Sequence, residues 1–261
     1  MGDRGRFETA SRPSGWEATY ATKLVEWLRL VAAEAGVQGA VFGLSGGVDS
    51  AVVAGLSVQA FPGESLGLIL PCDSVQQDMD DALAVAGVFD LPVKVVVLDA
   101  AYRALLAAVG EHDGDPGAIE AMTPKLALAN LKVRLRAVTW YYHANRLRRL
   151  VIGSGNRVEL TVGYFTKFGD GAVDVLPLAG LVKAEVRALA EHLGVPRRVI
   201  TKAPTAGLWP GQTDEEEMGL TYEVLDRFIL GGDVTEGAAN RIRRMIERSA
   251  HKRCLPRTPG F

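Results

Sequence analysis

The sequence AVFGLSGGVDS at residues 40–50 carries the clearest structural signal in the chain. Its first five residues are apolar or glycine and predict a buried strand, and a helix is expected from about Ser50. The glycines between strand and helix let the backbone turn sharply and approach an anion closely. Free amides at the start of the helix then face negative charge, and the hydroxyls of Ser45 and Ser50 add donors. The stretch therefore predicts a loop that binds phosphate.

Asp49 is out of place in a purely anion-binding loop, because its carboxylate would repel phosphate. A bridging cation removes this conflict, and Mg²⁺ favours a shell made of carboxylates and phosphate oxygens. No lysine follows the glycines, so the loop differs from the GxxxxGK[ST] loop of other nucleotide-binding proteins. A glycine-rich turn without a ligand is the plain alternative for such a stretch.

Apolar runs alternate with helical patterns on both sides of this loop. Further strands are expected at residues 66–70, 93–98, 150–152 and 173–178, and helices at residues 16–36, 124–145 and 183–193 and twice near the C-terminus. Ser74 is a candidate N-cap with Gln77 placed for a capping box, and Thr123 and Pro124 suit the start of a long helix. This alternation predicts an α/β fold with a doubly wound, mostly parallel sheet covered by helices on both faces.

The composition is that of an ordinary soluble globular protein, with 48% hydrophobic and 23% charged residues. We expect one domain at residues 16–261 after a flexible N-terminus at residues 1–15. A formal net charge of −2 provides no positive field for nucleic acid, and no apolar run is long enough to cross a membrane. Cys72 and Cys254 have no metal-binding spacing, so a reducing, cytoplasmic location is expected.

Six further motifs follow the loop in order. They are NLKVR at residues 130–134, GSGNRVE at 153–159, GYFTKFGDG at 163–171, KAPTAGL at 202–208, GQTDE at 211–215 and HKR at 251–253. The loop at residues 45–50 resembles the pyrophosphate loop of the ATP pyrophosphatase superfamily, whose members form adenylates. The ordered set resembles the ammonia-dependent NAD synthetases over residues 16–256. This resemblance implies a Rossmann-like, N-type ATP pyrophosphatase fold.

The implied reaction is the ATP- and Mg²⁺-dependent amidation of deamido-NAD by ammonia through an adenylate, with AMP and pyrophosphate released. The resemblance places ATP contacts on Gly43, Leu44, Ser45, Gly46, Gly47, Val48, Asp49, Ser50, Ser154, Lys183 and Thr205. We expect deamido-NAD contacts on Asn130, Arg134, Lys167, Asp174, His251 and Lys252. Asp49 and Glu159 would hold Mg²⁺, and the catalytic residues would be Asp49, Lys183 and Asp170. The Asp170 position is one that attracts ammonium and helps to deprotonate it.

Several of these residues also have ordinary explanations. Asn130 and Arg134 lie four apart on one helix face, which equally describes a basic surface facing solvent. Gly169-Asp170-Gly171 taken alone would be a turn. Gly155 and Gly207 stand where many bacterial members carry Asp, and these departures concern fine contacts rather than the reaction.

Two other functions remain open from the sequence. The chain could be another adenylate-forming enzyme that thiolates tRNA or forms GMP, although thiolation favours catalytic cysteines and a basic surface. It could also be a nucleotide-binding module without catalysis, which would not need the catalytic and metal-binding residues together. Only about 40 residues precede the first strand, too few for a glutaminase domain. We therefore expect free ammonia or a separate glutaminase partner, and the resemblance implies a homodimer.

Overall fold

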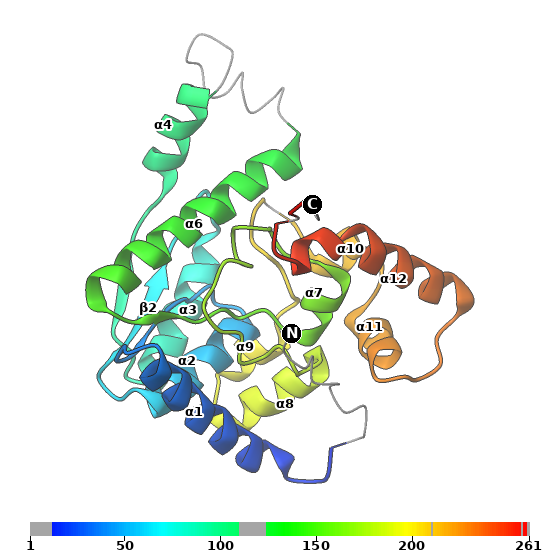
Figure 1. The fold of residues 1–261 in the computed structure, drawn as a ribbon, viewed down its shortest axis with the longest axis horizontal. Helices are drawn as coiled ribbons and strands as arrows, with labels where there is room; N and C mark the ends of the chain where they lie inside the picture. Colours follow the sequence, from blue (N-terminus) through cyan, green and yellow to red (C-terminus); the bar gives the residue numbers. More distant parts are fainter. Residues whose placement is uncertain (1–11, 110–123, 210, 257, 260–261) are drawn as a thin grey trace.

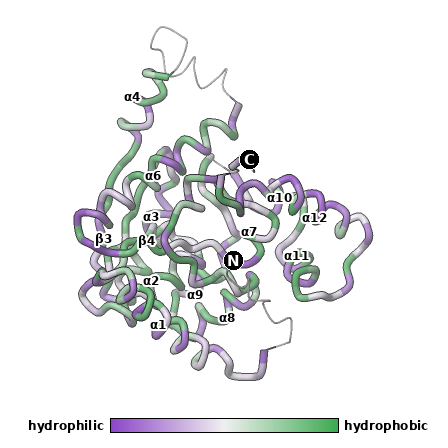
Figure 2. The backbone as a smooth tube through the Cα atoms, viewed as in Figure 1, coloured by the Kyte–Doolittle hydropathy of each residue, from purple (hydrophilic) through white to green (hydrophobic). Residues whose placement is uncertain are grey.

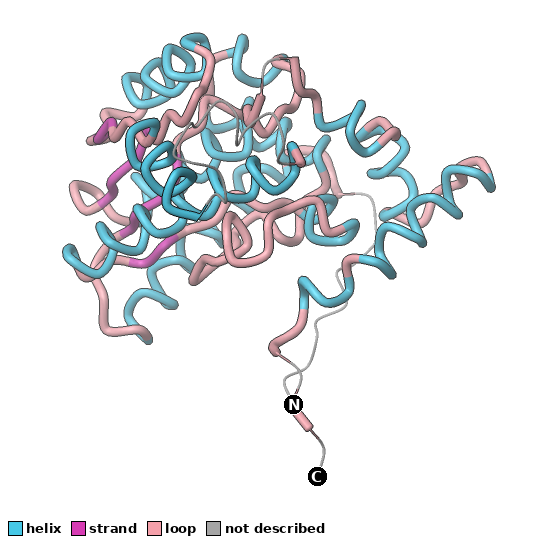
Figure 3. Tube along the Cα trace, turned by 90° about the horizontal axis from the view of Figure 1, so that it is seen from above, coloured by secondary structure: helices cyan, strands magenta, loops and turns pink. Residues whose placement is uncertain are grey.

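The computed structural model describes residues 12–109, 124–209, 211–256 and 258–259. Its centre is a parallel sheet with the strand order β3-β2-β1-β4. These strands are β1 (Ala40–Gly43), β2 (Ser65–Ile69), β3 (Val93–Val95) and β4 (Leu150–Val151). Seen from above, the short strands lie together with helices on either side of them (Figure 3). The predicted doubly wound α/β fold is confirmed.

The helices of the first half surround the sheet. They are α1 (Trp16–Glu34), α2 (Val48–Ala60), α3 (Gln76–Val88), α4 (Asp99–Val109) and α6 (Lys125–Leu147). Figure 1 shows α6 running across the body, while α4 and the start of α6 project from it. The second half adds α7 (Arg157–Val162), α8 (Lys183–Leu193), α9 (Arg197–Thr201), α10 (Asp214–Met218), α11 (Tyr222–Ile229), α12 (Glu236–Arg248) and the 3₁₀ turn η1 (Ala250–Arg253).

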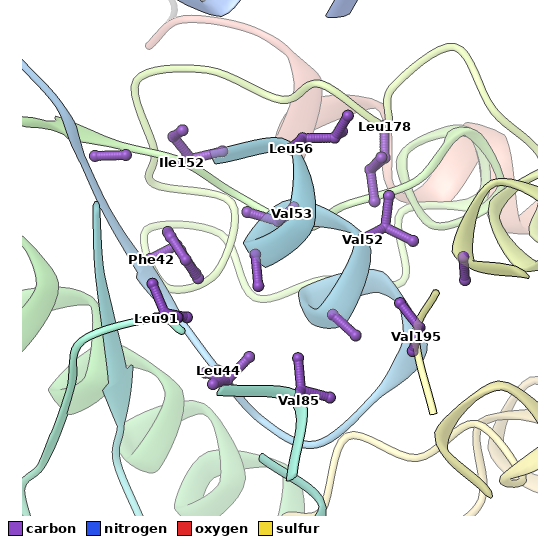
Figure 4. Close-up of a cluster of buried hydrophobic side chains, with 14 of the residues drawn as sticks. Phe42, Leu44, Val52, Val53, Leu56, Val85, Leu91, Ile152, Leu178 and Val195 are labelled. Carbon is purple, nitrogen blue, oxygen red and sulfur yellow. The ribbon is translucent and has the colours of Figure 1, made fainter. Parts of the chain in front are cut away.

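Successive residues of β1 point to opposite faces of the sheet and enter separate cores. Phe42 packs in a core with residues of α1, α2 and α8, part of which is shown in Figure 4. Val41 packs on the other face with residues of α4 and α6. A third cluster joins α7 to α11 and α12 through Val158, Leu225 and Ile242. The sheet edge that carries the phosphate loop therefore lies between well-packed layers.

The hydropathy of the helices follows their position. Figure 2 shows α2 mainly in the hydrophobic colour, and ten of its residues are buried. A helix that is apolar on all sides belongs in a core, and this one begins in the phosphate loop. By contrast, α12 is mainly hydrophilic in Figure 2 and buries only Ala239 and Ile242. The loop is thus anchored by a helix that is buried along most of its length.

Two strand predictions need correction. Residues 173–178 do not form a strand, since only Val175 makes an isolated parallel bridge, to Ile152. Asp174 explains this, because its side-chain carboxylate accepts the backbone amide of Val151 at 2.7 Å, and this bond takes the place of a regular bond between strands. The third strand is also shorter than predicted and ends at Val95.

Two helix starts also differ from the prediction. Val75, and not Ser74, occupies the N-cap of α3, and its side chain makes no capping bond. The Ser74 hydroxyl instead accepts the amide of Cys72 at 3.2 Å. Pro124 is the N-cap residue of α6 and not its first helical residue, while Thr123 lies outside the described residues. Residues 1–11 of the predicted flexible N-terminus also lie outside them, and the single domain stays a prediction.

Candidate active site

The phosphate loop is held in shape by its own side chains. The Ser50 hydroxyl accepts the amide of Ser45 at 3.2 Å and lies 3.1 Å from the Ser45 hydroxyl. It also donates to the carbonyl of Gly47 at 2.9 Å. Gly46 takes a φ of +78°, which favours glycine, and its Cα faces the first turn of α3. The loop amides are therefore ordered around the start of α2, as anion binding requires.

Asp49 lies in the first turn of α2 and contacts residues far away in the chain. Its Oδ1 accepts the side-chain amide of Asn156 at 3.0 Å, and its Oδ2 pairs with the Lys183 amine. The same amine lies 4.0 Å from Oε1 of Glu159. Three separate segments thus place two carboxylates and one amine together beside the loop.

Local capping fixes both partners of Asp49. The side-chain oxygen of Asn156 accepts the Glu159 amide at 3.0 Å, and Glu159 accepts the Asn156 amide at 3.2 Å, which forms a capping box at the start of α7. At the start of α8, Asp226 accepts the backbone amide of Lys183 at 3.1 Å. These caps leave little freedom to the carboxylate of Glu159 and the amine of Lys183.

The electrostatics of this cluster suit the binding of a cation. Burial, and then the charge of Asp49, raise the pKa of Glu159 to about 8. Burial alone lowers the pKa of Lys183, but Asp49 and Glu159 outweigh it and the pKa is raised. Asp214 adds a third carboxylate, 3.1 Å from the hydroxyl of Tyr222, and burial raises its pKa. Excess negative charge at this point favours a bound cation.

The residues present fit Mg²⁺ with substrate as co-ligand. The described residues hold no group of three or more His, Cys, Asp or Glu side chains arranged for a metal ion. Asp49 and Glu159 nevertheless meet beside a phosphate loop, and Mg²⁺ is usually held by one or two carboxylates together with phosphate and water. These two carboxylates are the side chains that would hold the ion.

A chamber of ≈ 230 Å³ opens over the loop. It is lined by residues 43–45 and 47–50 of the loop region together with Ser154, Glu159, Asp170, Lys183 and Thr205. The chamber also reaches Lys202, whose amine pairs with Asp78 at 2.8 Å and Asp81 at 2.7 Å. Nearly all of the predicted ATP contacts therefore share one cavity.

Asp170 stands at the side of the chamber formed by the segment at residues 163–171. Its Oδ1 accepts the amide of Thr166 at 2.7 Å, and Thr166 in turn donates its hydroxyl to Asn130 at 2.7 Å. Surrounding protein displaces water and raises the pKa of Asp170 to about 6, although the residue stays exposed to the open chamber. The carboxylate is thus a base at neutral pH that is easily protonated.

A sequence model described as NAD synthase matches residues 20–256. The chain belongs to the NAD synthase family. It is 49% identical to the NH(3)-dependent NAD(+) synthetase of Carboxydothermus hydrogenoformans, over 94% of this chain and 98% of that protein.

Solved structures agree with this membership. An NMN synthetase from Francisella tularensis has a TM-score of 0.86 and 42% identity, and the match covers 94% of this chain and 99% of that chain. The NH3-dependent NAD synthetase of Campylobacter jejuni, solved with nitrate, has a TM-score of 0.75 and 26% identity, with 93% and 98% covered. Both matches extend over nearly the whole of each chain.

The positions expected to contact deamido-NAD lie outside the chamber and are engaged with one another. Arg134 is exposed and donates to the carbonyl of Lys167 at 3.2 Å, while the Lys167 amine donates to the carbonyl of His251 at 2.8 Å. Lys252 donates to the carbonyls of Gly163 and Phe165, at 2.8 and 2.6 Å. The C-terminal turn thus clamps the segment that carries Asp170.

Asp174 forms hydrogen bonds with a different part of the protein. It accepts the Tyr141 hydroxyl at 3.0 Å as well as the Val151 amide, so its carboxylate holds the end of the sheet together. A direct contact with substrate would require one of these bonds to open. The structure brings Asp174 to the sheet edge but not into the chamber.

Sequence reasoning missed several residues that this family member brings to the chamber. They are Asp78, Arg136, Trp140, Tyr164, Lys202 and Asp214. Tyr164, Lys202 and Asp214 lie inside quoted motifs, but the sequence assigned no role to them. Arg136 and Trp140 carry no local signal, because only helix packing decides which face of α6 meets the chamber.

Proposed function

We propose that this chain amidates deamido-NAD with ammonia at the expense of ATP, and that the chamber is where the reaction takes place. The observation that supports this most directly is the meeting of Asp49, Glu159 and Lys183 beside the phosphate loop. In the proposed first step, the nicotinate carboxylate attacks the α-phosphate of ATP and pyrophosphate leaves. Ammonia then attacks the adenylate, and AMP leaves with formation of the amide.

The proposed roles follow from position. Loop amides and the Lys183 amine would stabilise the charge that builds on the leaving pyrophosphate, which is preorganised electrostatic stabilisation. Mg²⁺ between Asp49 and Glu159 would supply further charge neutralisation at the phosphates. Asp170 would take a proton from the incoming ammonium, since its carboxylate is ionised at neutral pH and faces the same cavity. The clamped segment at residues 163–171 would guide the dinucleotide to this side.

The test is NAD formation from deamido-NAD, ATP, Mg²⁺ and ammonium, with AMP and pyrophosphate measured in the same tubes. A second acceptor, nicotinate mononucleotide, belongs in the assay because one similar protein is described as an NMN synthetase. NAD matched by AMP supports the proposal. ATP cleavage with the mononucleotide only would keep the adenylation chemistry and replace the acceptor. Glutamine in place of ammonium tests for a separate glutaminase partner.

Assembly and location are further parts of the proposal. Exposed apolar side chains on α6, Leu126, Val138 and Tyr142, support a homodimer in which this helix is buried. Light scattering after chromatography tests this, and a monomer at micromolar concentration would contradict it.

No helix within the described residues is both long and apolar enough to cross a membrane. Two free cysteines support a reducing cytoplasm as the site of action.

A further inference from the structure

One face of α6 forms a wall of the chamber that the proposed roles do not use. Val133, Arg136 and Trp140 follow each other at steps of three and four, so their side chains share this face. All three line the chamber, whereas Arg134 lies on the exposed side of the same helix. A β-carbon added at Gly169 would lie 2.8 Å from Val133, so this wall directly adjoins the segment that carries Asp170.

Arg136 is a partly buried cation that has no carboxylate in contact among the described residues. Its guanidinium donates to the carbonyl of Leu70 at 3.2 Å and to the hydroxyl of Ser74 at 3.3 Å, both neutral acceptors. Within the described chain it forms no ion pair, although Asp170 and Asp78 are near enough to act on its charge. Burial lowers the pKa of Arg136. A partly buried guanidinium that lines a cavity and has no carboxylate in contact can accept an anionic ligand without first breaking an ion pair.

The other cations of this region differ from Arg136 in this respect. Lys132 pairs with Asp73 at 3.0 Å. Lys183 and Lys202 each pair with carboxylates of the loop or of α3. Their charges are therefore balanced inside the protein. Among these four side chains, only Arg136 has no carboxylate partner and can bind an external anion.

Trp140 adds an unused donor to the same wall. A β-carbon at Gly43 would lie 2.8 Å from Cζ2 and 3.0 Å from Nε1 of Trp140, so the indole lies against the backbone at the end of β1. Its Nε1 is buried and has no acceptor among the described residues. Buried indole N–H groups usually find a partner, and an aromatic ring in a cavity offers a surface for another ring.

We propose that Arg136 and Trp140 receive the aromatic carboxylate group of the acceptor substrate, with Arg136 on the carboxylate and Trp140 on the ring. This inference rests on the proposed function. The reacting carboxylate must reach the α-phosphate at the loop and then, as the adenylate, meet ammonia beside Asp170. Arg136 is within electrostatic reach of Asp170, and Trp140 lies against the strand end that leads into the loop. The triphosphate already has the loop amides and Lys183.

The experiment compares binding of the two substrates separately. Wild type, Arg136→Gln, Arg136→Lys and Trp140→Phe are titrated by calorimetry with deamido-NAD and, independently, with ATP and Mg²⁺. Arg146→Gln, exposed on the same helix, is the matched control. We expect Arg136→Gln to weaken deamido-NAD binding about 10- to 100-fold, the range for a lost charged hydrogen bond, with ATP binding changed less than about twofold. Arg136→Lys should recover part of the loss.

Trp140→Phe keeps an aromatic ring but removes the indole N–H together with the five-membered ring, and it leaves Arg136 in place, so it tests the same wall independently of the arginine variants. We expect it to weaken deamido-NAD binding about 3- to 10-fold and to leave ATP binding unchanged. Binding losses confined to ATP would overturn the proposal and assign this wall to adenosine. Unchanged binding of both substrates in folded variants would also overturn it. Turnover of wild type with ammonium is measured beside these titrations, so failure of the proposed function is seen separately.

Discussion

Replacing Gly46 by alanine is expected to destabilise the protein through the phosphate loop. The φ of +78° at this position costs a residue with a β-carbon about 1–2 kcal/mol. The added carbon would also lie 2.4 Å from the carbonyl oxygen of Asp78, which is backbone of α3 and must shift. An overpacked site adds about 1–2 kcal/mol, for a total of about 2–4 kcal/mol.

Gly47 provides the matched control one residue away. Its φ is −91°, and an added β-carbon would meet only the Ser45 hydroxyl, at 3.4 Å. We expect Gly46→Ala to lower the melting temperature of the ligand-free protein by about 6–12 °C, at roughly 3 °C per kcal/mol, and Gly47→Ala by less than about 2 °C. Differential scanning calorimetry without nucleotide separates this effect from lost ATP contacts. Equal melting temperatures for the two variants would refute the steric reasoning.

Three further predictions concern the chemistry. Asp170→Asn should reduce turnover about 10²- to 10⁴-fold. In the wild type, turnover with ammonium should fall as the pH drops through about 6, because the Asp170 carboxylate becomes protonated. A pH profile without this decrease would contradict the role of Asp170 as the base. Lys252→Met removes a cation that lowers the pKa of Asp170, so the acid limb should move to higher pH, whereas Lys252→Arg should leave it in place. Lys183→Met should slow pyrophosphate release about 100-fold or more, measured by single turnover, and a loss below tenfold would exclude its role at the leaving group.

Local features of this protein could be predicted from the sequence because their causes are local. The strand, the glycine turn and the helix at residues 40–60 depend on neighbours in the chain. The structure has the predicted order of strand, loop and helix there. The stop of α8 at Gly194 also follows from one residue, whose φ is +81°. Family motifs extended this reasoning to Asp49, Glu159 and Lys183, which the fold brings together.

Contacts between distant segments could not be predicted in this way. Arg134 and Arg136 are two residues apart on one helix, and the family resemblance assigns only the first to the substrate. Packing of α6 against β1 and the segment at residues 163–171 directs the side chain of Arg136 toward the chamber. Lys252 is predicted to contact the substrate, and the structure adds that its amine donates to two backbone carbonyls of that segment. Nothing near these residues in the chain distinguishes the outcomes.

The class of fold, the phosphate loop and the family could be predicted from the sequence, because local backbone conformation and the order of motifs depend on consecutive residues. The tertiary structure shows which side chains face the chamber, how the carboxylates of Asp49 and Glu159 meet the Lys183 amine, and that Arg136 forms no ion pair within the described residues. Those properties depend on helix rotation and on burial by segments more than a hundred residues away, as in the pairing of Asp49 with Lys183. Free energy of charge burial is set by that surrounding protein and not by the residue type alone.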